Sequence, residues 1–184
     1  GTAAALLDRL RPQTRNCRVL DTTRIPPPRP FSLLPKRRCV VETEVESLIF
    51  TVEISTPGRG FQEISGELRS RVPQAGVQAG LCHVFLRHTS ASLLITENAD
   101  PDVRRDLESY ITRLVPDGDP AYLHSMEGPD DMPAHIRSVL TSSELTLPIR
   151  EGRLALGTWQ GVYLWEHRMH PHRRRIEISI IDLN

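Results

Sequence analysis

The sequence lacks long apolar runs. Stretches such as Leu48-Ile49-Phe50 are short and soon interrupted by charge, whereas a helix that crosses a bilayer needs about 20 consecutive apolar residues. We therefore expect no membrane-spanning segment and no membrane partner. Hydrophobic residues still make up 39% of the 184-residue chain, which is enough for one packed core but, at this length, not for two large ones.

Cysteine is also scarce. The three cysteines, Cys17, Cys39 and Cys82, form no C-x2-C pair, and their odd number argues against a disulfide framework. This pattern favours a reducing compartment, and we expect a cytoplasmic protein. Cys82 lies within an apolar segment, so we expect it to be a small buried residue.

The chain has no net charge, yet its 23 basic and 23 acidic residues are unevenly distributed. Residues 1–40 contain nine Lys and Arg against two Asp, and residues 41–184 contain 14 basic against 21 acidic residues. The run Pro26-Pro27-Pro28 favours an extended backbone in the basic part. We place a boundary near Arg38 and predict a basic, proline-rich N-terminal arm over residues 1–38 and one domain over residues 39–184.

The arm allows three interpretations. An Arg-rich leader with few acids is typical of an organelle transit peptide, which makes organelle targeting an alternative to the cytoplasm. A flexible or partner-packed extension explains the same composition, and the presence of Asp8 and Asp21 favours it. Nucleic-acid attachment would use the same charge, but Phe31 is the only aromatic residue of the arm, so we expect no nucleic-acid partner.

Strand patterns outnumber helix patterns in residues 39–184. Period-two alternation and short apolar runs predict strands over 40–56, 81–87, 93–96, 145–149, 153–156, 162–166 and 174–183. Short turns between the last four strands favour antiparallel pairing. We therefore predict an α+β fold, mainly an antiparallel β-sheet or sandwich, with about three helices.

Two helix patterns precede residue 117. The first has apolar residues at 61, 64, 68 and 72 and is expected to end at Pro73 and the turn region from Gly76 to Gly80. The second has Asp100 as its N-cap and Pro101 in its first turn, and Pro116 stops it. Its apolar residues recur at 103, 107, 110, 111 and 114, on one face of the helix.

The third helix pattern begins at Asp130-Asp131, which we expect to cap it. Its apolar residues Ile136, Val139 and Leu140 are expected to face the interior.

A turn rich in hydroxyl groups follows the predicted strand 81–87. In His88-Thr89-Ser90-Ala91-Ser92 the small side chains let a ligand approach the backbone, and Thr89 and Ser90 can hold phosphate oxygens. An ST-turn with a satisfied histidine is an equally good interpretation. A serine nucleophile is not expected, because the turn lacks a G-x-S-x-G elbow. Asn98 leads into the N-terminus of the second helix, where free backbone N–H groups favour an anion.

Asp131 and His135 lie four residues apart at the start of the third helix. Their side chains therefore project from one face and can share a metal ion or a hydrogen bond. His124 and Glu127 lie just upstream, on a loop that can fold back. Imidazole with carboxylate suits zinc, whereas magnesium prefers carboxylates and substrate phosphates. The spacing matches no standard zinc signature, so surface histidines without a ligand are the alternative.

Two further segments carry candidate binding groups. Thr158-Trp159-Gln160 offers a flat stacking face and a hydrogen-bonding head, with a hairpin turn whose Trp covers the core as the alternative. Glu166 and Arg168 are expected on the same side of a strand, where they form an ion pair or a site for a charged ligand. Arg173 to Arg175 are expected in a basic surface turn.

Six segments resemble, in order, the YjbQ family, which is also called UPF0047. They are His-Thr-Ser-Ala-Ser at 88–92, Glu-Asn-Ala-Asp-Pro at 97–101, Arg-Leu-Val-Pro at 113–116, Glu-Gly-Pro-Asp-Asp-Met-Pro-Ala-His at 127–135, Gly-Arg-Leu-Ala-Leu-Gly-Thr-Trp-Gln-Gly at 152–161 and Glu-His-Arg at 166–168. The likeness extends from about Cys39 to the C-terminus and leaves out residues 1–38.

The resemblance implies an α+β domain with a large antiparallel sheet, assembled as a homotrimer with sites near the subunit contacts. It also implies a divalent metal, zinc or magnesium, and a small phosphorylated substrate. Carried over by position, the metal ligands are His88, His124 and His135, the catalytic residues are Asp131, Glu166 and Arg168, and the substrate-binding residues are Thr89, Ser90, Asn98, Thr158, Trp159 and Gln160.

Members of the family are described as secondary thiamine-phosphate synthases. These transferases condense hydroxymethylpyrimidine diphosphate with thiazole phosphate and release pyrophosphate. We expect this activity, as a main or a side reaction. The alternative is a trimeric protein that binds a metal or a small phosphate ligand without turnover. Few cations lie in the matching segments beyond Arg104, Arg105 and Arg168, which favours a slow or different phosphate chemistry.

Overall fold

The computed structural model describes residues 47–183. The predicted arm, its boundary near Arg38 and residues 40–46 of the first predicted strand therefore lie outside the described residues.

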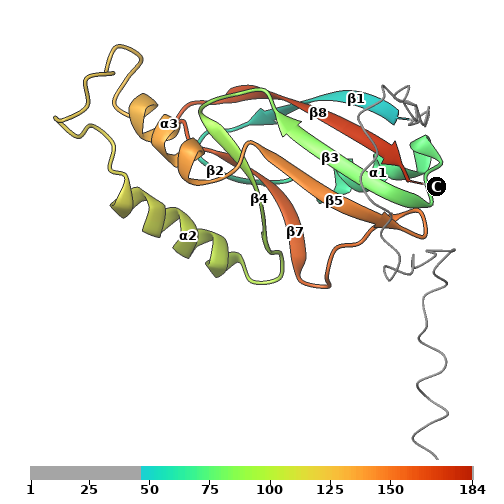
Figure 1. The fold of residues 1–184 in the computed structure, drawn as a ribbon. Coiled ribbons are helices and arrows are strands. Elements are labelled where there is room, and N and C mark those ends of the chain that lie inside the picture. The colour runs from blue at the N-terminus through green and yellow to red at the C-terminus, as the bar shows by residue number, and fades with distance from the viewer. Residues whose placement is uncertain (1–46, 184) are drawn as a thin grey trace, which may run out of the picture. The chain divides into compact units, whose positions relative to one another are not determined.

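Within residues 47–183 the chain forms eight strands and three helices (Figure 1). In chain order they are β1 (Ser47–Thr56), β2 (Gly60–Glu63), α1 (Ser65–Ala75), β3 (Ala79–Leu86), β4 (Ala91–Glu97), α2 (Pro101–Leu114), α3 (Asp131–Leu140), β5 (Glu144–Arg150), β6 (Arg153–Leu154), β7 (Gln160–Glu166) and β8 (His172–Asp182). None of these helices is long and apolar enough to cross a membrane.

The strands form two sheets, with the orders β1-β8-β3-β5-β6 and β2-β7-β4. Every pairing between these strands is antiparallel. The predicted class, an α+β fold dominated by antiparallel sheet with three helices, is confirmed.

β8 shows why the larger sheet forms. Its alternating sequence buries Arg174, Ile176, Ile178 and Ile180 on one face and turns the residues between them outward. Val162 and Leu164 of β7 belong to the same hydrophobic core as these isoleucines. Burying each large aliphatic side chain contributes about 1.5–3 kcal/mol, so the apolar contact between the two sheets is the main source of stability.

β7 is buried on both faces. Its residues Tyr163 and Trp165 lie on the face opposite Val162 and Leu164, because side chains alternate along a strand. Phe61 of β2 stacks on Trp165 with ring centroids 4.4 Å apart. This aromatic layer is covered by α2, whose Glu108 Oε2 accepts a hydrogen bond of 2.6 Å from Trp165 Nε1.

The first helix differs from the prediction at its N-terminal end, and it ends in the predicted turn region rather than at Pro73 itself. Phe61 lies in β2, paired with Trp165 of β7, and α1 begins at Ser65. Ladder pairing and aromatic stacking thus outweigh the helical spacing of Phe61. The helix continues past Pro73 to Ala75 and ends at Gly76, whose φ of 70° is the left-handed conformation that glycine adopts readily.

α2 begins as predicted, with the Asp100 carboxylate accepting a hydrogen bond of 2.8 Å from the Asp102 N–H. Its apolar face, however, is poorly covered within the subunit. Of the five apolar residues on this face only Ile111 is buried, and Tyr110 and Leu114 are 61% and 56% exposed.

In α3 the predicted inward face is wrong for Val139 and Leu140, whereas Ile136 is half-buried. Val139 and Leu140 are exposed, and the buried residues are Asp131, Pro133, Ala134 and Arg137. The small Ala134 allows close packing, and Arg137 points inward to donate a hydrogen bond of 2.7 Å to the Val115 carbonyl. Asp130 occupies the N-cap position as predicted, but its side chain makes no capping hydrogen bond.

Cys82 in β3 is a buried free thiol, as predicted. Burial raises its pKa to about 11, so the thiol stays protonated at neutral pH.

The core predicts a simple stability contrast. Ile178 is 1% exposed and Ile49, in the same sheet, is 63% exposed. We expect Ile178→Ala to lower the free energy of unfolding by about 2–5 kcal/mol through lost burial and a cavity, and Ile49→Ala to change it by less than about 0.5 kcal/mol. Urea denaturation of both variants checks this; equal losses would contradict the assigned core.

Candidate functional site

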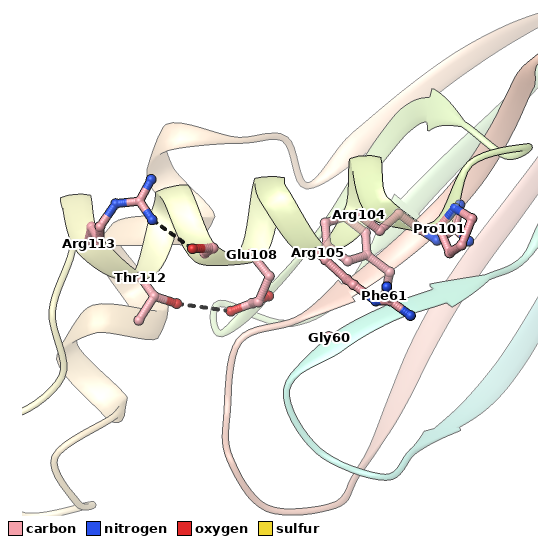
Figure 2. Close-up of a pocket in the computed structure, with 9 residues that line it drawn as sticks. Gly60, Phe61, Pro101, Arg104, Arg105, Glu108, Thr112 and Arg113 are labelled. Carbon is pink, nitrogen blue, oxygen red and sulfur yellow. Dashed lines mark hydrogen bonds between the residues drawn. The ribbon is translucent and has the colours of Figure 1, made fainter.

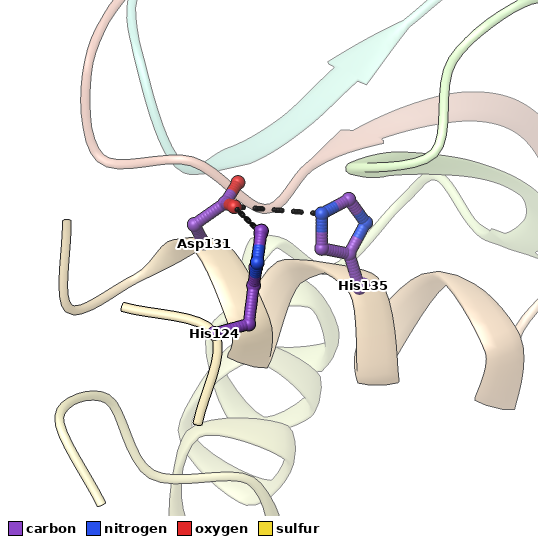
Figure 3. A group of neighbouring side chains, drawn as sticks. All are labelled: His124, Asp131 and His135. Carbon is purple, nitrogen blue, oxygen red and sulfur yellow. Dashed lines mark hydrogen bonds and ion pairs between the residues drawn. The ribbon is translucent and has the colours of Figure 1, made fainter. Parts of the chain in front are cut away.

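His124, Asp131 and His135 converge at the N-terminal end of α3 (Figure 3). Asp131 and His135 are one helical turn apart, and His124 reaches them from the loop before α3. His124 Nε2 lies 2.6 Å from Asp131 Oδ2, and His135 Nε2 lies 3.5 Å from the same oxygen. One ligand atom from each residue lies within 4.8 Å of the others. The predicted fold-back of this loop thus holds for His124.

A backbone carbonyl sets the tautomer of His135. Its Nδ1 is 3.0 Å from Thr89 O, and a carbonyl oxygen can only accept a hydrogen bond. Nδ1 therefore carries the proton, and in the neutral ring the lone pair of Nε2 faces the Asp131 carboxylate. Two electron-rich atoms in this arrangement repel each other unless a proton or a cation lies between them.

Arg168 holds the other side of Asp131. Its Nη1 contacts Asp131 Oδ1, its Nε lies 3.1 Å from Asp130 Oδ2, and its Nη2 donates to the Glu127 carbonyl at 2.7 Å. All three guanidinium nitrogens are engaged with this chain. Arg168 thereby turns Asp131 Oδ2 toward the two imidazoles.

Asp130 has a supporting role at this corner. It accepts hydrogen bonds from Arg168 Nε and, at 2.8 Å, from the Met169 N–H. Burial alone would raise the pKa of Asp130, but these two hydrogen bonds outweigh it and leave the pKa below its ordinary value. Asp130 is therefore a carboxylate at neutral pH and keeps Arg168 in place.

Glu166 lies on the inner face of β7 and is fully buried. Arg174 of β8 donates to it from Nε at 2.7 Å and from Nη2 at 2.5 Å. Thr56 Oγ1 and the Arg168 N–H also donate, at 2.9 and 3.0 Å. Burial would raise the pKa of Glu166, but the hydrogen bonds, led by that from Arg174, lower it below its ordinary value.

The expected pairing of the Glu166 and Arg168 side chains is wrong. β7 ends at Glu166, so Arg168 no longer follows the strand alternation and turns to Asp130 and Asp131. The ionic partner of Glu166 is Arg174, which is 3% exposed rather than part of a basic surface turn.

His88 lies outside the three-residue cluster. Its Nε2 accepts a hydrogen bond of 2.8 Å from the Arg175 N–H, which leaves the proton of the neutral ring on Nδ1. Burial, followed by the charge of Arg174, lowers the pKa of His88. His88 and Thr89 do line a cavity of about 810 Å³ together with His135, so the cavity opens beside the cluster.

The remaining predicted substrate residues lie elsewhere. In the β4·β7 ladder Ala91 pairs with Glu166, and Glu97 pairs with Gln160. Six residues of strand span about 20 Å, so Gln160 lies far from Glu166 within one subunit. Trp159, which is 65% exposed, lines a separate cavity of about 560 Å³ with Gln160.

Asn98 and Thr158 flank the same end of the sheet, and the Asn98 N–H donates to the Trp159 carbonyl at 3.0 Å. Ser90 lies at the other end of the β4·β7 ladder, next to the pair Ala91 and Glu166. Its carbonyl accepts a hydrogen bond of 3.3 Å from Arg174 Nη2. The structure thus brings together one set of predicted residues around His135 and another around Trp159, without joining the two.

Sequence reasoning missed a buried serine–histidine pair beneath the site. Ser92 Oγ lies 2.9 Å from His167 Nε2, and both residues are fully buried. Burial lowers the pKa of His167 to about 3, and the charge of Arg137 adds to this, so the ring is neutral. Since both groups are sealed from solvent, they tie β4 to the end of β7 rather than act as a nucleophile and base.

Comparisons with known proteins identify the fold's relatives. Residues 50–183 match the family described as UPF0047 protein YjbQ-like. The chain belongs to the YjbQ/UPF0047 family. A UPF0047 protein of Synechocystis is 53% identical over 127 residues, which cover 69% of this chain and 86% of that protein. The UPF0047 protein YjbQ of Salmonella typhimurium is 48% identical over 127 residues, covering 68% and 91%.

Solved structures of YjbQ-like proteins share the fold. A conserved hypothetical protein of Thermus thermophilus superposes with a TM-score of 0.64 at 34% identity, covering 70% of this chain and 97% of its own. A YjbQ/UPF0047 protein of Clostridium acetobutylicum, described as uncharacterized, gives a TM-score of 0.63 at 34% identity, covering 72% and 98%. The family and the fold are therefore established for this chain.

The Glu166–Arg174 pair predicts a pH-dependent stability. The pKa of Glu166 in the folded state lies below its ordinary 4.5, so its contribution is complete above that pH and is lost as the pH falls through the folded-state pKa. At pH 7 we expect Glu166→Gln to cost about 3–5 kcal/mol, because Arg174 is left buried without its partner. Urea denaturation between pH 7 and pH 3 should show this cost shrinking with acid.

The exposed Glu63 provides the matched control. Glu63→Gln should leave both the free energy of unfolding at pH 7 and its pH profile close to the parent. If Glu166→Gln lowers the free energy of unfolding by the same amount at pH 3 as at pH 7, the lowered pKa assigned to Glu166 is contradicted.

Proposed function

We propose that this chain is a metal-dependent transferase that acts on a small phosphorylated substrate. The reaction that its family resemblance implies is the secondary thiamine-phosphate synthase reaction. The observation that carries the proposal is the convergence of His124, Asp131 and His135 beside the cavity that His88, Thr89 and His135 line.

The donor set fits a divalent cation. Two imidazole nitrogens and one carboxylate oxygen suit zinc or a similar transition metal better than magnesium. The 3.5 Å between His135 Nε2 and Asp131 Oδ2 is close to the roughly 3.3 Å that separates two ligands on a tetrahedral zinc. His124 Nε2, at 2.6 Å from Asp131 Oδ2, must release its proton and move slightly to become a ligand.

In the proposed reaction the thiazole nitrogen bonds to the methylene carbon of the pyrimidine as the carbon–oxygen bond breaks, and the electron pair leaves with pyrophosphate. A bound divalent cation would stabilise the negative charge that develops on the departing oxygen. The Nδ1–H of His88 and the Thr89 hydroxyl would hold phosphate oxygens in the cavity. Arg168 and Glu166 act as positioning residues, because their hydrogen bonds fix Asp131 and the end of β7.

One observation favours the alternative of ligand binding without turnover. A dedicated diphosphate site is expected to offer several free cations, yet Arg168 is tied to Asp130, Asp131 and Glu127. Arg174 is tied to Glu166. The thiamine-forming reaction would therefore be slow at this site.

The substitution His135→Ala tests both forms of the proposal. We expect it to weaken zinc binding at least tenfold, measured by calorimetry on metal-stripped protein, and to abolish product formation from the two thiamine precursors. His83, a histidine on β3 that bonds Thr146, gives the control His83→Ala, which should bind zinc as the parent does.

The outcomes separate the alternatives. Zinc binding without product in the parent supports the binding protein over the enzyme. Zinc binding of equal strength in parent and His135→Ala would refute the metal site itself.

We further propose that the chain assembles as a homotrimer whose contacts cover the outer side of α2 and α3. Tyr110 and Leu114 on α2, Val139 and Leu140 on α3 and Leu123 on the connecting loop are exposed large apolar side chains, which monomeric proteins seldom gather on one region. Such an assembly would also let the cavity at Trp159 and Gln160 of one subunit approach His124, Asp131 and His135 of another.

Charging this surface should disrupt the assembly. We expect the double substitution Tyr110→Glu and Leu114→Glu to convert the trimer into monomers, measured by light scattering coupled to gel filtration, because buried uncompensated carboxylates are costly. Ser109→Glu, on the side of α2 that faces Gly60 and Phe61 of β2, is the control and should remain trimeric. A monomeric parent would refute the proposed assembly.

A further inference from the structure

A third cavity is a groove between α2 and β2, apart from His124, Asp131 and His135 (Figure 2). It has a volume of about 840 Å³ and is lined by Phe61, Arg104, Arg105, Glu108 and Arg113 among others. This volume is within the range of small-molecule sites. None of its lining residues belongs to the group His124, Asp131 and His135.

The floor of this groove is a fixed aromatic side chain. Phe61 stacks on Trp165 with an interplanar angle of 23° and meets Tyr163 edge-on at 6.1 Å. Trp165 is itself held by its hydrogen bond to Glu108. Because this layer is packed before any ligand arrives, a flat ring that binds against Phe61 incurs little ordering cost.

The groove also carries a surplus of positive hydrogen-bond donors. Arg104 lies over the Tyr163 ring at 5.4 Å and uses Nη1 for its bonds to Glu97 O and Tyr163. Arg105 bonds Asp102 through Nη1, and its side chain is 75% exposed. Each guanidinium has five N–H donors, so both retain donors for a ligand.

Glu108 offsets one of the three positive charges that line the groove, and Asp102, which is not a lining residue, pairs with Arg105. Glu108 accepts from Trp165 Nε1 with one oxygen and from Thr112 Oγ1 with the other. Three arginines therefore face one carboxylate whose two oxygens are already hydrogen-bonded. An anionic group is the complement of such a lining.

We propose that this groove binds a small molecule in which a flat ring carries an anionic group such as phosphate. Figure 2 shows Phe61 next to Arg104 and Arg105, with Arg113 at the far end of the groove. The ring lies against Phe61 and the anion lies between Arg104 and Arg105. This inference uses no atom of His124, Asp131 or His135 and does not depend on the proposed function.

The experiment uses phenyl phosphate as the probe and Trp165 as the reporter. The chain has two tryptophans, so Trp159→Phe leaves Trp165 as the only one. Titration of this full-length protein in the presence of EDTA should change the Trp165 fluorescence saturably. EDTA removes any cation from the other site, so cation-dependent binding there cannot contribute to the signal, and the comparison with Arg105→Gln assigns the remaining signal to the groove.

Substitutions and simpler probes define the ligand class. We expect Arg105→Gln to weaken phenyl phosphate binding roughly tenfold, as the loss of one charged hydrogen bond does. Arg150→Gln, which removes an exposed arginine of β5 outside the groove, should bind as the parent does. Phenol and inorganic phosphate, each carrying half of the probe, should bind at least tenfold more weakly.

Three results would overturn the proposal. They are a titration without saturable change, equal affinity in Arg105→Gln and the parent, and affinity for either half-probe equal to that for phenyl phosphate.

Discussion

The buried ion pair between Glu166 and Arg174 joins the two sheets at the point where the site is built. Arg174 comes from the inner face of β8 and Glu166 from the inner face of β7. Removing two charges from water is costly, and such a pair is tolerated only when its remaining hydrogen-bonding groups are satisfied. Here the carboxylate accepts four hydrogen bonds, two from Arg174 and one each from Thr56 and the Arg168 backbone.

The same pair fixes the start of a chain of contacts that ends at the imidazoles. Because Glu166 anchors the Arg168 backbone, the Arg168 side chain is aimed at Asp130 and Asp131. Asp131 then presents its second oxygen to His124 and His135. The arrangement of the candidate cation site therefore depends on the contact between the sheets as much as on its own residues.

Several features follow directly from the sequence. The period-two pattern of β8, the cap of α2 and the four-residue spacing of Asp131 and His135 are local, and the fold class follows from them. Other features depend on tertiary contacts. Phe61 has helical spacing but lies in β2 because Trp165 offers a stacking partner. Arg174 belongs to a basic run, yet a carboxylate on the other sheet draws it inward.

The orientation of the helices also depends on tertiary contacts that the sequence pattern does not show. α2 places Arg104 over the Tyr163 ring of β7 and leaves Tyr110 and Leu114 of its apolar face exposed. α3 turns Arg137 inward and Val139 outward. A hydrophobic pattern predicts that a helix face will be covered, but it does not indicate whether the same subunit covers it.

The carbonyl of Thr89 has one more consequence. It positions the proton on His135 through the main chain, and every amino acid supplies the same carbonyl group. The orientation of His135 therefore does not depend on which side chain stands at position 89. For that orientation selection must preserve the path of the backbone, whereas only the proposed phosphate contact requires the threonine hydroxyl.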